Sequence, residues 1–258
     1  APPIAISIIF GALLTKVGLY SIIRTYGLFY YESSFIKSYI LILGAISIVA
    51  GCIGAIYQKD LKQIVIFNIV ISLGVMVCGT ATLNTFGVKG ALFYAVNDIL
   101  LKAALFIIVG LIIYVSGVKY VQKCGLINRY PLLGWTYFIV VLSLAGVPPF
   151  SGFYGKALII KGLITNNNTF IAVLVALSGL VVFYSLIKVF LNVFYDNINK
   201  SLILKPLPKG VQIPLIVIVT IALIIGVSTN LLDDFFDKGI QMVLNPQHYI
   251  DLVLKKGA

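Results

Sequence analysis

Four charged side chains, at Lys16, Asp98, Lys102 and Lys156, lie within long apolar stretches of this sequence. A charge at the centre of a lipid bilayer costs about 2.5 to 3.5 kcal/mol on insertion scales, so such residues usually face the protein interior or a water-filled path. Burial and neighbouring charges determine whether a lysine or an aspartate holds its proton. These residue types in this setting therefore indicate proton transfer across a membrane.

Asp98 and Lys102 are four residues apart. This spacing places them on one face of a helix with the acid nearer the N-terminus, which is the favourable order, and predicts that they pair. One interpretation is a structural ion pair that neutralises itself. The other is a carboxylate that controls a proton-carrying lysine, and the two interpretations are compatible.

Lys16 and Lys156 have no opposite charge within one helical turn of sequence. Each could extend its ammonium to the membrane surface or meet a partner on another helix. Lys16 lies too deep in its segment to reach the surface easily. We expect both lysines to act as proton relays, which is the common role of ionisable residues inside membranes.

Three uncharged polar residues accompany the charges. Asn68 and Ser72 are four residues apart on one predicted helix, and Asn97 adjoins Asp98. They either form hydrogen bonds between helices or hold waters between the charged residues. We expect them to support proton transfer.

Pro148 and Pro149 interrupt the apolar stretch over residues 132–164, and Gly146 and Gly152 flank them. Proline removes an amide donor and clashes with the preceding helical turn, whereas glycine tolerates unusual dihedral angles. The interruption is either a loop between two short helices or a break in a transmembrane helix. A broken helix at membrane depth is tolerated only where it faces protein or water, so the second interpretation predicts an ion-translocating protein with a hinge at the prolines.

The composition places these residues in a membrane. The chain has 258 residues, of which 60% are hydrophobic and 10% charged, and its mean hydropathy is +1.09. Soluble domains contain about 25% charged residues, so we predict an all-α integral membrane protein. The net charge of +11 does not indicate a nucleic-acid partner, because the cations are spread over short loops.

The sequence contains no motif for a metal, a cofactor or hydrolysis. Its three cysteines lack metal-ligand spacing, it has one histidine, and it has no phosphate-binding or dinucleotide-binding loop. We therefore expect no catalytic residue, cofactor or metal site here, and no enzyme. The driving force must then come from an ion gradient or from partner subunits.

About seven apolar segments approach the roughly 20 residues that a membrane-spanning helix requires. They cover residues 4–26, 36–57, 64–83, 90–115, 132–164, 170–194 and 211–231. We expect a transmembrane domain over residues 1–231 and an amphipathic or flexible tail over residues 232–258. Because the sequence opens without methionine directly onto an apolar segment, we also expect a fragment of a longer chain.

Lysine and arginine gather in the loops after the second, fourth and sixth segments. Short loops rich in these cations stay in the cytoplasm. The first segment is therefore expected to run outward from the cytoplasm, and the tail to end outside.

Four stretches resemble the D subunits of multisubunit Mrp-type Na⁺/H⁺ antiporters, which are homologous to the antiporter-like, proton-pumping subunits of respiratory complex I. They are TKVGLYSIIR at residues 15–24, YQKDLKQIVIFNIVISLG at 57–74, FYAVNDILLKAALFIIVG at 93–110 and GVPPFSGFYGK at 146–156. The resemblance covers nearly the whole chain and is weakest after residue 231. Each motif alone is shared more widely, but VND-x₃-K together with PPFSGFYGK points to the D subunits.

The resemblance implies a subunit of about fourteen helices, built from two inverted repeats with one broken helix in each. This chain would start at the eighth helix and contain the second repeat. Lys16 then matches the central lysine of the eighth helix, and Lys156 matches the twelfth-helix lysine at the proton exit. Complex I relatives often have histidine where this chain has Ser72 and Asp98, and the difference favours the antiporter branch.

The implied function is a proton-translocating subunit of a Na⁺/H⁺ antiporter, held in the lipid bilayer of a bacterial cell membrane with other subunits of a hetero-oligomeric complex. Protons would pass along an axis that links Lys16, the Asp98–Lys102 pair and Lys156. One alternative is a proton-pumping subunit of an NADH:quinone oxidoreductase. Another is a structural subunit whose charges only pair with their neighbours.

Replacing both Pro148 and Pro149 with alanine tests the break. A continuous helix over residues 135–164 would be roughly 45 Å long at about 1.5 Å per residue, well beyond a hydrocarbon core of about 30 Å. A continuous helix would also move Lys156 relative to Lys102. We expect antiport per assembled complex to fall sharply, measured by a pH-sensitive dye in everted vesicles with subunit content taken from a native gel. Full activity would show that the prolines form only a tolerated kink.

Overall fold

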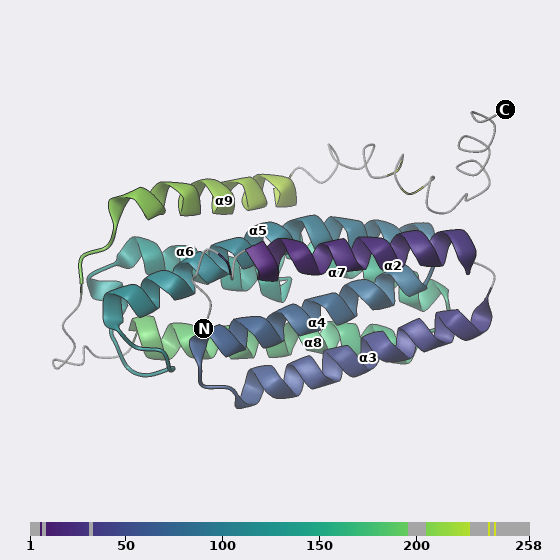
Figure 1. Ribbon diagram of the computed structural model, residues 1–258, viewed down its shortest axis with the longest axis horizontal. Helices are drawn as coiled ribbons and strands as arrows, with labels where there is room; N and C mark the ends of the chain where they lie inside the picture. The colour runs from purple at the N-terminus through teal and green to yellow at the C-terminus, as the bar shows by residue number, and fades with distance from the viewer. Residues whose placement is uncertain are drawn as a thin grey trace.

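The computed structural model describes residues 6, 9–30, 33–195, 205–227, 237 and 240, and long helices that lie side by side dominate it (Figure 1). The first half contains the π-helix η1 (Ile9–Leu14), α2 (Thr15–Phe29), α3 (Ser34–Tyr57), α4 (Leu61–Ala81) and α5 (Thr85–Ser116). The second half contains the short 3₁₀ helix η2 (Leu126–Asn128), α6 (Pro131–Ala145), α7 (Ser151–Thr165), α8 (Thr169–Val189), the π-helix η3 (Phe190–Tyr195) and α9 (Lys209–Val227).

The predicted apolar segments correspond to these helices, which confirms an all-α membrane fold. Among the residues that the structure describes, four helical stretches are long and apolar enough to cross a membrane: Ser34–Tyr57, Leu61–Ala81, Thr85–Ser116 and Thr169–Tyr195. The other predicted segments correspond to η1 with α2, to α6 and α7 on either side of the break, and to the shorter α9. Residues 228–231 and most of the expected tail lie outside the described residues.

Polar caps explain why two helices start earlier than the apolar pattern predicts. Asp60 precedes α4 and accepts hydrogen bonds from the backbone amides of Lys62 and Gln63, at 2.8 and 3.2 Å. Asn84 precedes α5 and accepts one from the amide of Gly87 at 2.7 Å. Side-chain oxygens at this position satisfy amides that have no partner within the helix. The helices therefore begin at their caps, several residues before their longest apolar runs.

Helix α5 is the centre of the bundle. It contacts η1, α4, α6, α7 and α9, and most of its residues are buried. By contrast, α3 turns large apolar side chains outward, including Phe35 and Ile46, as expected of a helix that faces lipid or other membrane helices. The residues that α5 carries are thus shielded from the surroundings by helices on several sides.

Glycines bring α7 directly against α5. A Cβ added at Gly155 would lie 2.8 Å from the Cβ of Tyr94, and one added at Gly90 would lie 2.7 Å from the backbone nitrogen of Ile159. Small residues at the contact allow membrane helices to approach closely. The close approach places Lys156, which directly follows Gly155, beside α5.

The lysine-rich loops share one end of the bundle. The loop after α3 pairs with the loop after α5, where the amide of Val121 donates to the carbonyl of Lys59 at 2.8 Å. After α8, the amide of Lys205 donates to the carbonyl of Val115 at 3.0 Å. The grouping of these loops that the topology argument requires is therefore confirmed.

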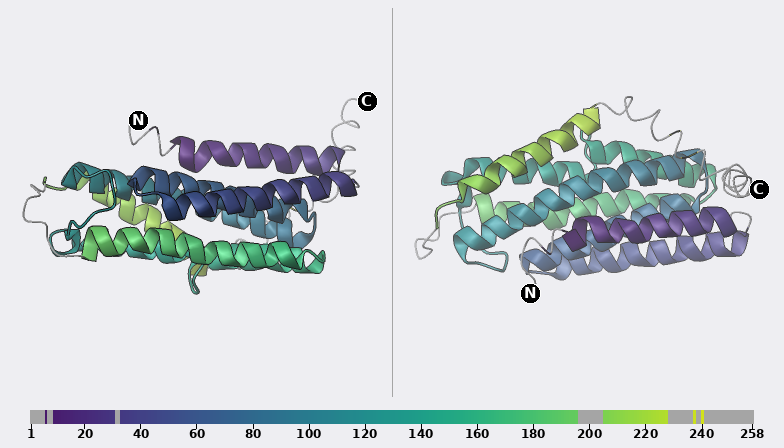
Figure 2. Two further views of the ribbon diagram at one scale, coloured as in Figure 1. Left: turned by 90° about the horizontal axis from the view of Figure 1, so that it is seen from below. Right: turned by 45° about the horizontal axis from the view of Figure 1, so that its top comes forward.

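Helix α9 crosses α5 obliquely on the outside of the bundle (Figure 2). It also packs against α7. A Cβ added at Gly226 would lie 2.5 Å from the backbone nitrogen of Ser151. The end of α9 therefore covers the point where α7 begins.

Substituting Gly155→Ala should weaken the α5–α7 contact. The added methyl group would overlap Tyr94, and overpacking a core typically costs about 1 to 3 kcal/mol. We expect a lower midpoint of thermal unfolding for the purified complex. Gly18→Ala is the matched control, because a Cβ there would meet no atom within 4 Å. Equal midpoints for the two variants would contradict the close packing described here.

Candidate proton-transfer site

Lys16 and Asp98 form a salt bridge inside the bundle. The ammonium of Lys16 on α2 pairs with Oδ2 of Asp98 on α5, and the two side chains are only 6% and 0% exposed. Of the alternatives that the sequence left open for Lys16, a partner on another helix is therefore the one found. The predicted pairing of Asp98 with Lys102 is wrong, because within the described part of the chain Asp98 pairs with Lys16. Helical spacing identifies neighbours on one helix only, whereas this cation is 82 residues away in the sequence.

Asp98 also contacts the third predicted helix. The hydroxyl of Ser72 on α4 lies 3.1 Å from Oδ2 of Asp98, within hydrogen-bond distance. The other carboxylate oxygen, Oδ1, has no hydrogen-bond partner among the described residues. One carboxylate thus joins α2, α4 and α5, and keeps one buried oxygen free to accept a proton or a hydrogen bond.

Lys102 lies one turn after Asp98 on α5 and is 1% exposed. Across the described residues, its ammonium makes no hydrogen bond and no salt bridge. An ammonium has three donors, and a buried charge without partners is strongly unfavourable. We therefore expect bound water to solvate Lys102.

Asn68 provides a polar group at the level of Lys102. Helices α4 and α5 are antiparallel neighbours, and Ser72 faces Asp98. Asn68, one turn before Ser72, is therefore level with Lys102, one turn after Asp98. The amide nitrogen of Asn68 donates to Ser185 on α8 at 3.1 Å. Its Oδ1 is buried and has no partner in the described structure. Asn68 is therefore both an interhelical contact, as predicted, and a free acceptor for water.

The predicted break is found between α6 and α7, at residues 146–150. Gly146 ends α6 with a φ of +84°, a backbone conformation that glycine tolerates best. Pro148 and Pro149 follow in the connecting segment and are joined by a cis peptide bond. The stretch thus forms two helices on either side of the prolines, as both interpretations of the sequence predict.

Lys156 turns back toward the end of the first limb. Its Nζ donates hydrogen bonds to the carbonyl oxygens of Leu144 and Ala145, both at 2.9 Å. We call these two carbonyl oxygens the Lys156 seat. The last carbonyls of a helix have no partner within the helix and carry partial negative charge. Lys156 is only 6% exposed, so these two carbonyl oxygens replace part of the hydration that its ammonium loses on burial.

A chain of side-chain hydrogen bonds links the break to α5. Oδ1 of Asn97 accepts a hydrogen bond from the hydroxyl of Ser151, the first residue of α7. The Ser151 hydroxyl lies 3.2 Å from the hydroxyl of Ser143 on α6. Nδ2 of Asn97 has no partner among the residues described. Both limbs of the break are thereby connected to the residue next to Asp98.

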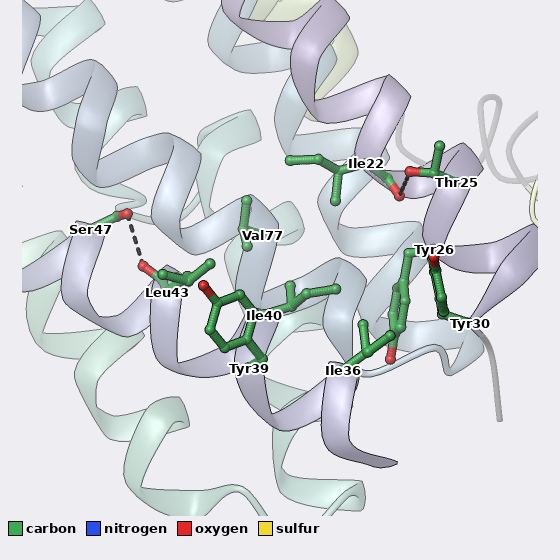
Figure 3. Close-up of a pocket in the computed structure, with 11 residues that line it drawn as sticks. Ile22, Thr25, Tyr26, Tyr30, Ile36, Tyr39, Ile40, Leu43, Ser47 and Val77 are labelled. Atoms are coloured by element: carbon green, nitrogen blue, oxygen red, sulfur yellow. Dashed lines mark hydrogen bonds between the residues drawn. The ribbon is translucent and has the colours of Figure 1, made fainter. Parts of the chain in front are cut away.

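The two serines of this hydrogen-bonded chain were not among the residues predicted from the sequence. Ser143 and Ser151 stand on either side of the double proline, and that position was the one signal that could have found them. The Lys156 seat consists of backbone atoms, so no side-chain pattern could indicate it. A cleft of about 450 Å³ between α2 and α3 (Figure 3) is lined by other residues, such as Tyr26, Tyr39 and Val77, and does not belong to this site.

A double-mutant cycle on Lys16→Met and Asp98→Asn tests the observed pair. Removing one partner leaves a buried charge uncompensated. The stability losses of the two single variants should therefore add up to more than the loss in the double variant. We expect a coupling energy of about 1 to 3 kcal/mol in thermal or denaturant unfolding. The same cycle with Lys102→Met and Asp98→Asn should give a smaller value. The reverse ranking would restore the pairing expected from helical spacing.

Comparison with known proteins places this arrangement in a family. Residues 1–181, which include all four buried charges, match the family described as NADH:quinone oxidoreductase/Mrp antiporter, transmembrane. The D subunit of the Na⁺/H⁺ antiporter of Bacillus subtilis (strain 168) is 38% identical over 263 residues, covering 99% of this chain and 52% of the relative. The corresponding D subunit of Alkalihalophilus pseudofirmus is 34% identical over 258 residues, with the same coverage. The chain thus spans about half the length of the curated relatives it matches.

Solved structures share the fold. In the structure of the Mrp complex from Dietzia sp. DQ12-45-1b, one chain superposes with a TM-score of 0.91 at 21% identity, over 97% of this chain and 55% of that chain. A chain of respiratory complex I from Thermus thermophilus gives 0.76 at 22% identity, over 89% and 49%. Both complexes therefore contain a chain with this overall fold. The family match covers most of the residues and the whole row of buried charges, and this chain belongs to the NADH:quinone oxidoreductase/Mrp antiporter transmembrane family.

Proposed function

We propose that this chain forms part of a proton-translocating subunit of a multisubunit Na⁺/H⁺ antiporter in a bacterial cell membrane. The similarity to two antiporter D subunits supports the antiporter. The row of buried ionisable residues supports proton movement within this chain. Other subunits of the complex and the Na⁺ and H⁺ gradients would supply what the chain does not contain.

The observation that carries the proposal is the Lys156 ammonium on the end of a broken helix. The charged form of the side chain satisfies two carbonyl oxygens and is favoured by the helix dipole. The neutral amine interacts with them less strongly. Protonation of Lys156 is thereby linked to the position of its side chain, as a proton relay requires.

The remaining charges couple the protonation states of the relay residues to one another. Lys102 and Lys156 bear like charges, and a proton that arrives at one disfavours the proton on the other. Asp98 attracts both cations, but it is already paired with Lys16. A change in the Lys16–Asp98 pair would therefore alter the charge balance at Lys102, and Lys102 would pass that change on to Lys156.

Neutral polar groups fill the intervals between the charged residues. Ser72 contacts Asp98, Asn68 lies level with Lys102, and Asn97 connects to Ser151 at the break. Protons move along hydrogen bonds, so these groups and the waters that they bind would supply the path. The buried acceptors and donors without partners mark where such waters would bind.

A proton-pumping subunit of a quinone oxidoreductase is the second candidate, because the family and the fold are common to both kinds of complex. The same lysine relay would operate there under a redox driving force. The neighbouring genes distinguish the two: small antiporter subunits favour the first, and dehydrogenase subunits favour the second.

Substituting Lys156→Ala should abolish antiport and leave assembly intact, because the relay loses the group that holds the proton. Na⁺-dependent dequenching of a pH-sensitive dye in everted vesicles measures transport, and a native gel measures assembly. Lys161→Ala on the same helix is the matched control, because Lys161 is exposed and its ammonium lies 3.8 Å from the centre of the Phe86 ring. Near-normal dequenching in the Lys156 variant would refute the relay.

A further inference from the structure

A glycine on a neighbouring helix faces the Lys156 seat. Gly179 lies on α8, and a Cβ added there would be 2.9 Å from the carbonyl oxygen of Ala145 and 3.5 Å from Nζ of Lys156. The first distance is shorter than almost any real contact of a Cβ atom. The absence of a side chain at this one position therefore leaves room for both a carbonyl of the seat and the ammonium.

A second glycine borders the same side chain from the opposite helix. A Cβ added at Gly146 would lie 3.0 Å from Cδ and 3.5 Å from Nζ of Lys156. Both glycines have Lys156 among the nearest atoms that an added Cβ would meet. The far end of Lys156 thus lies between two positions that have no side chain.

We propose that Gly179 is a positioning residue for proton transfer at Lys156, because its missing side chain lets the ammonium lie on the α6 carbonyls. The proposal rests on the proton-relay role of Lys156 given above. A methyl group at this position would displace the Ala145 carbonyl, the ammonium or both. The hydrogen bonds that hold the charged lysine would then lengthen.

The contact is more specific than close helix packing. Gly74 on α4 is also pressed against a backbone carbonyl, since a Cβ added there would lie 2.8 Å from the oxygen of Gly44. The other atoms nearest to that added Cβ belong to Ile48, which carries no charge. Gly74 is therefore at least as tightly packed as Gly179, but only Gly179 also lies close to an ammonium.

The test is the pH profile of antiport for the complex carrying Gly179→Ala. We expect transport at the optimum to fall about 10- to 100-fold, because a misplacement of about 1 Å can cost about 100-fold in rate. We also expect the profile to move toward lower pH, because hydrogen bonds to the ammonium help it to keep its proton. The ionisable groups that act on Lys156 are Lys102, Asp98 and Tyr94 on α5 and Cys52 on α3, and the substitution changes none of them.

Gly74→Ala is the control for steric crowding, and Gly18→Ala is the control for the substitution itself. Gly74→Ala should lower stability or rate without moving the profile. Gly18→Ala, where the added atom meets nothing within 4 Å, should resemble the unsubstituted complex. An unshifted profile in Gly179→Ala, or an equal shift in Gly74→Ala, would overturn the proposal.

A second variant decides the matter if Gly179→Ala does not assemble. Gly146→Ala crowds the same lysine from the other side and adds no hydrogen-bond acceptor. It should shift the profile in the same direction, and an unshifted profile would count against positioning by these glycines. Full transport by Lys156→Ala would instead refute the relay itself, so the two failures can be told apart.

Discussion

The contact between the Lys156 ammonium and the last carbonyls of α6 is the interaction on which the rest of this structure depends. Inside a bilayer, free backbone carbonyls and a free ammonium are each strongly unfavourable. At the break they satisfy one another. The double proline can therefore interrupt a membrane helix because the lysine follows it, and the lysine can be buried because the helix ends beside it. Each feature therefore contributes to the stability of the other.

Helix α5 positions the residues around this contact. Its glycine contact with α7 brings Lys156 close, and the same helix carries Asp98 and Lys102. The pair of Lys16 with Asp98 neutralises one cation, which leaves two buried ammonium groups, on α5 and α7. Like charges in a medium of low dielectric constant disfavour simultaneous protonation. A site built for stability alone would avoid that arrangement, whereas a site that passes a proton onward uses it.

Much of this could be predicted from the sequence, and what could not has a common physical cause. Apolar length indicated the helices, proline and glycine indicated the break, and unusual charges indicated Lys16, Asp98, Lys102 and Lys156. The partners of those charges were different from what spacing suggested, because spacing along one helix carries no information about a neighbouring helix. Asp98 pairs with Lys16 on α2 and not with Lys102 on its own helix. The Lys156 seat consists of backbone atoms, which look alike in every sequence.

Three buried polar atoms without partners also indicate a site built for proton transfer rather than for stability. Oδ1 of Asn68, Nδ2 of Asn97 and Oδ1 of Asp98 have no hydrogen bond within the described residues, and each such group costs about 1 to 3 kcal/mol when it stays unsatisfied. All three belong to residues of α4 and α5. Local departures from good packing are expected at functional sites, so these atoms mark where water would complete a path between the lysines.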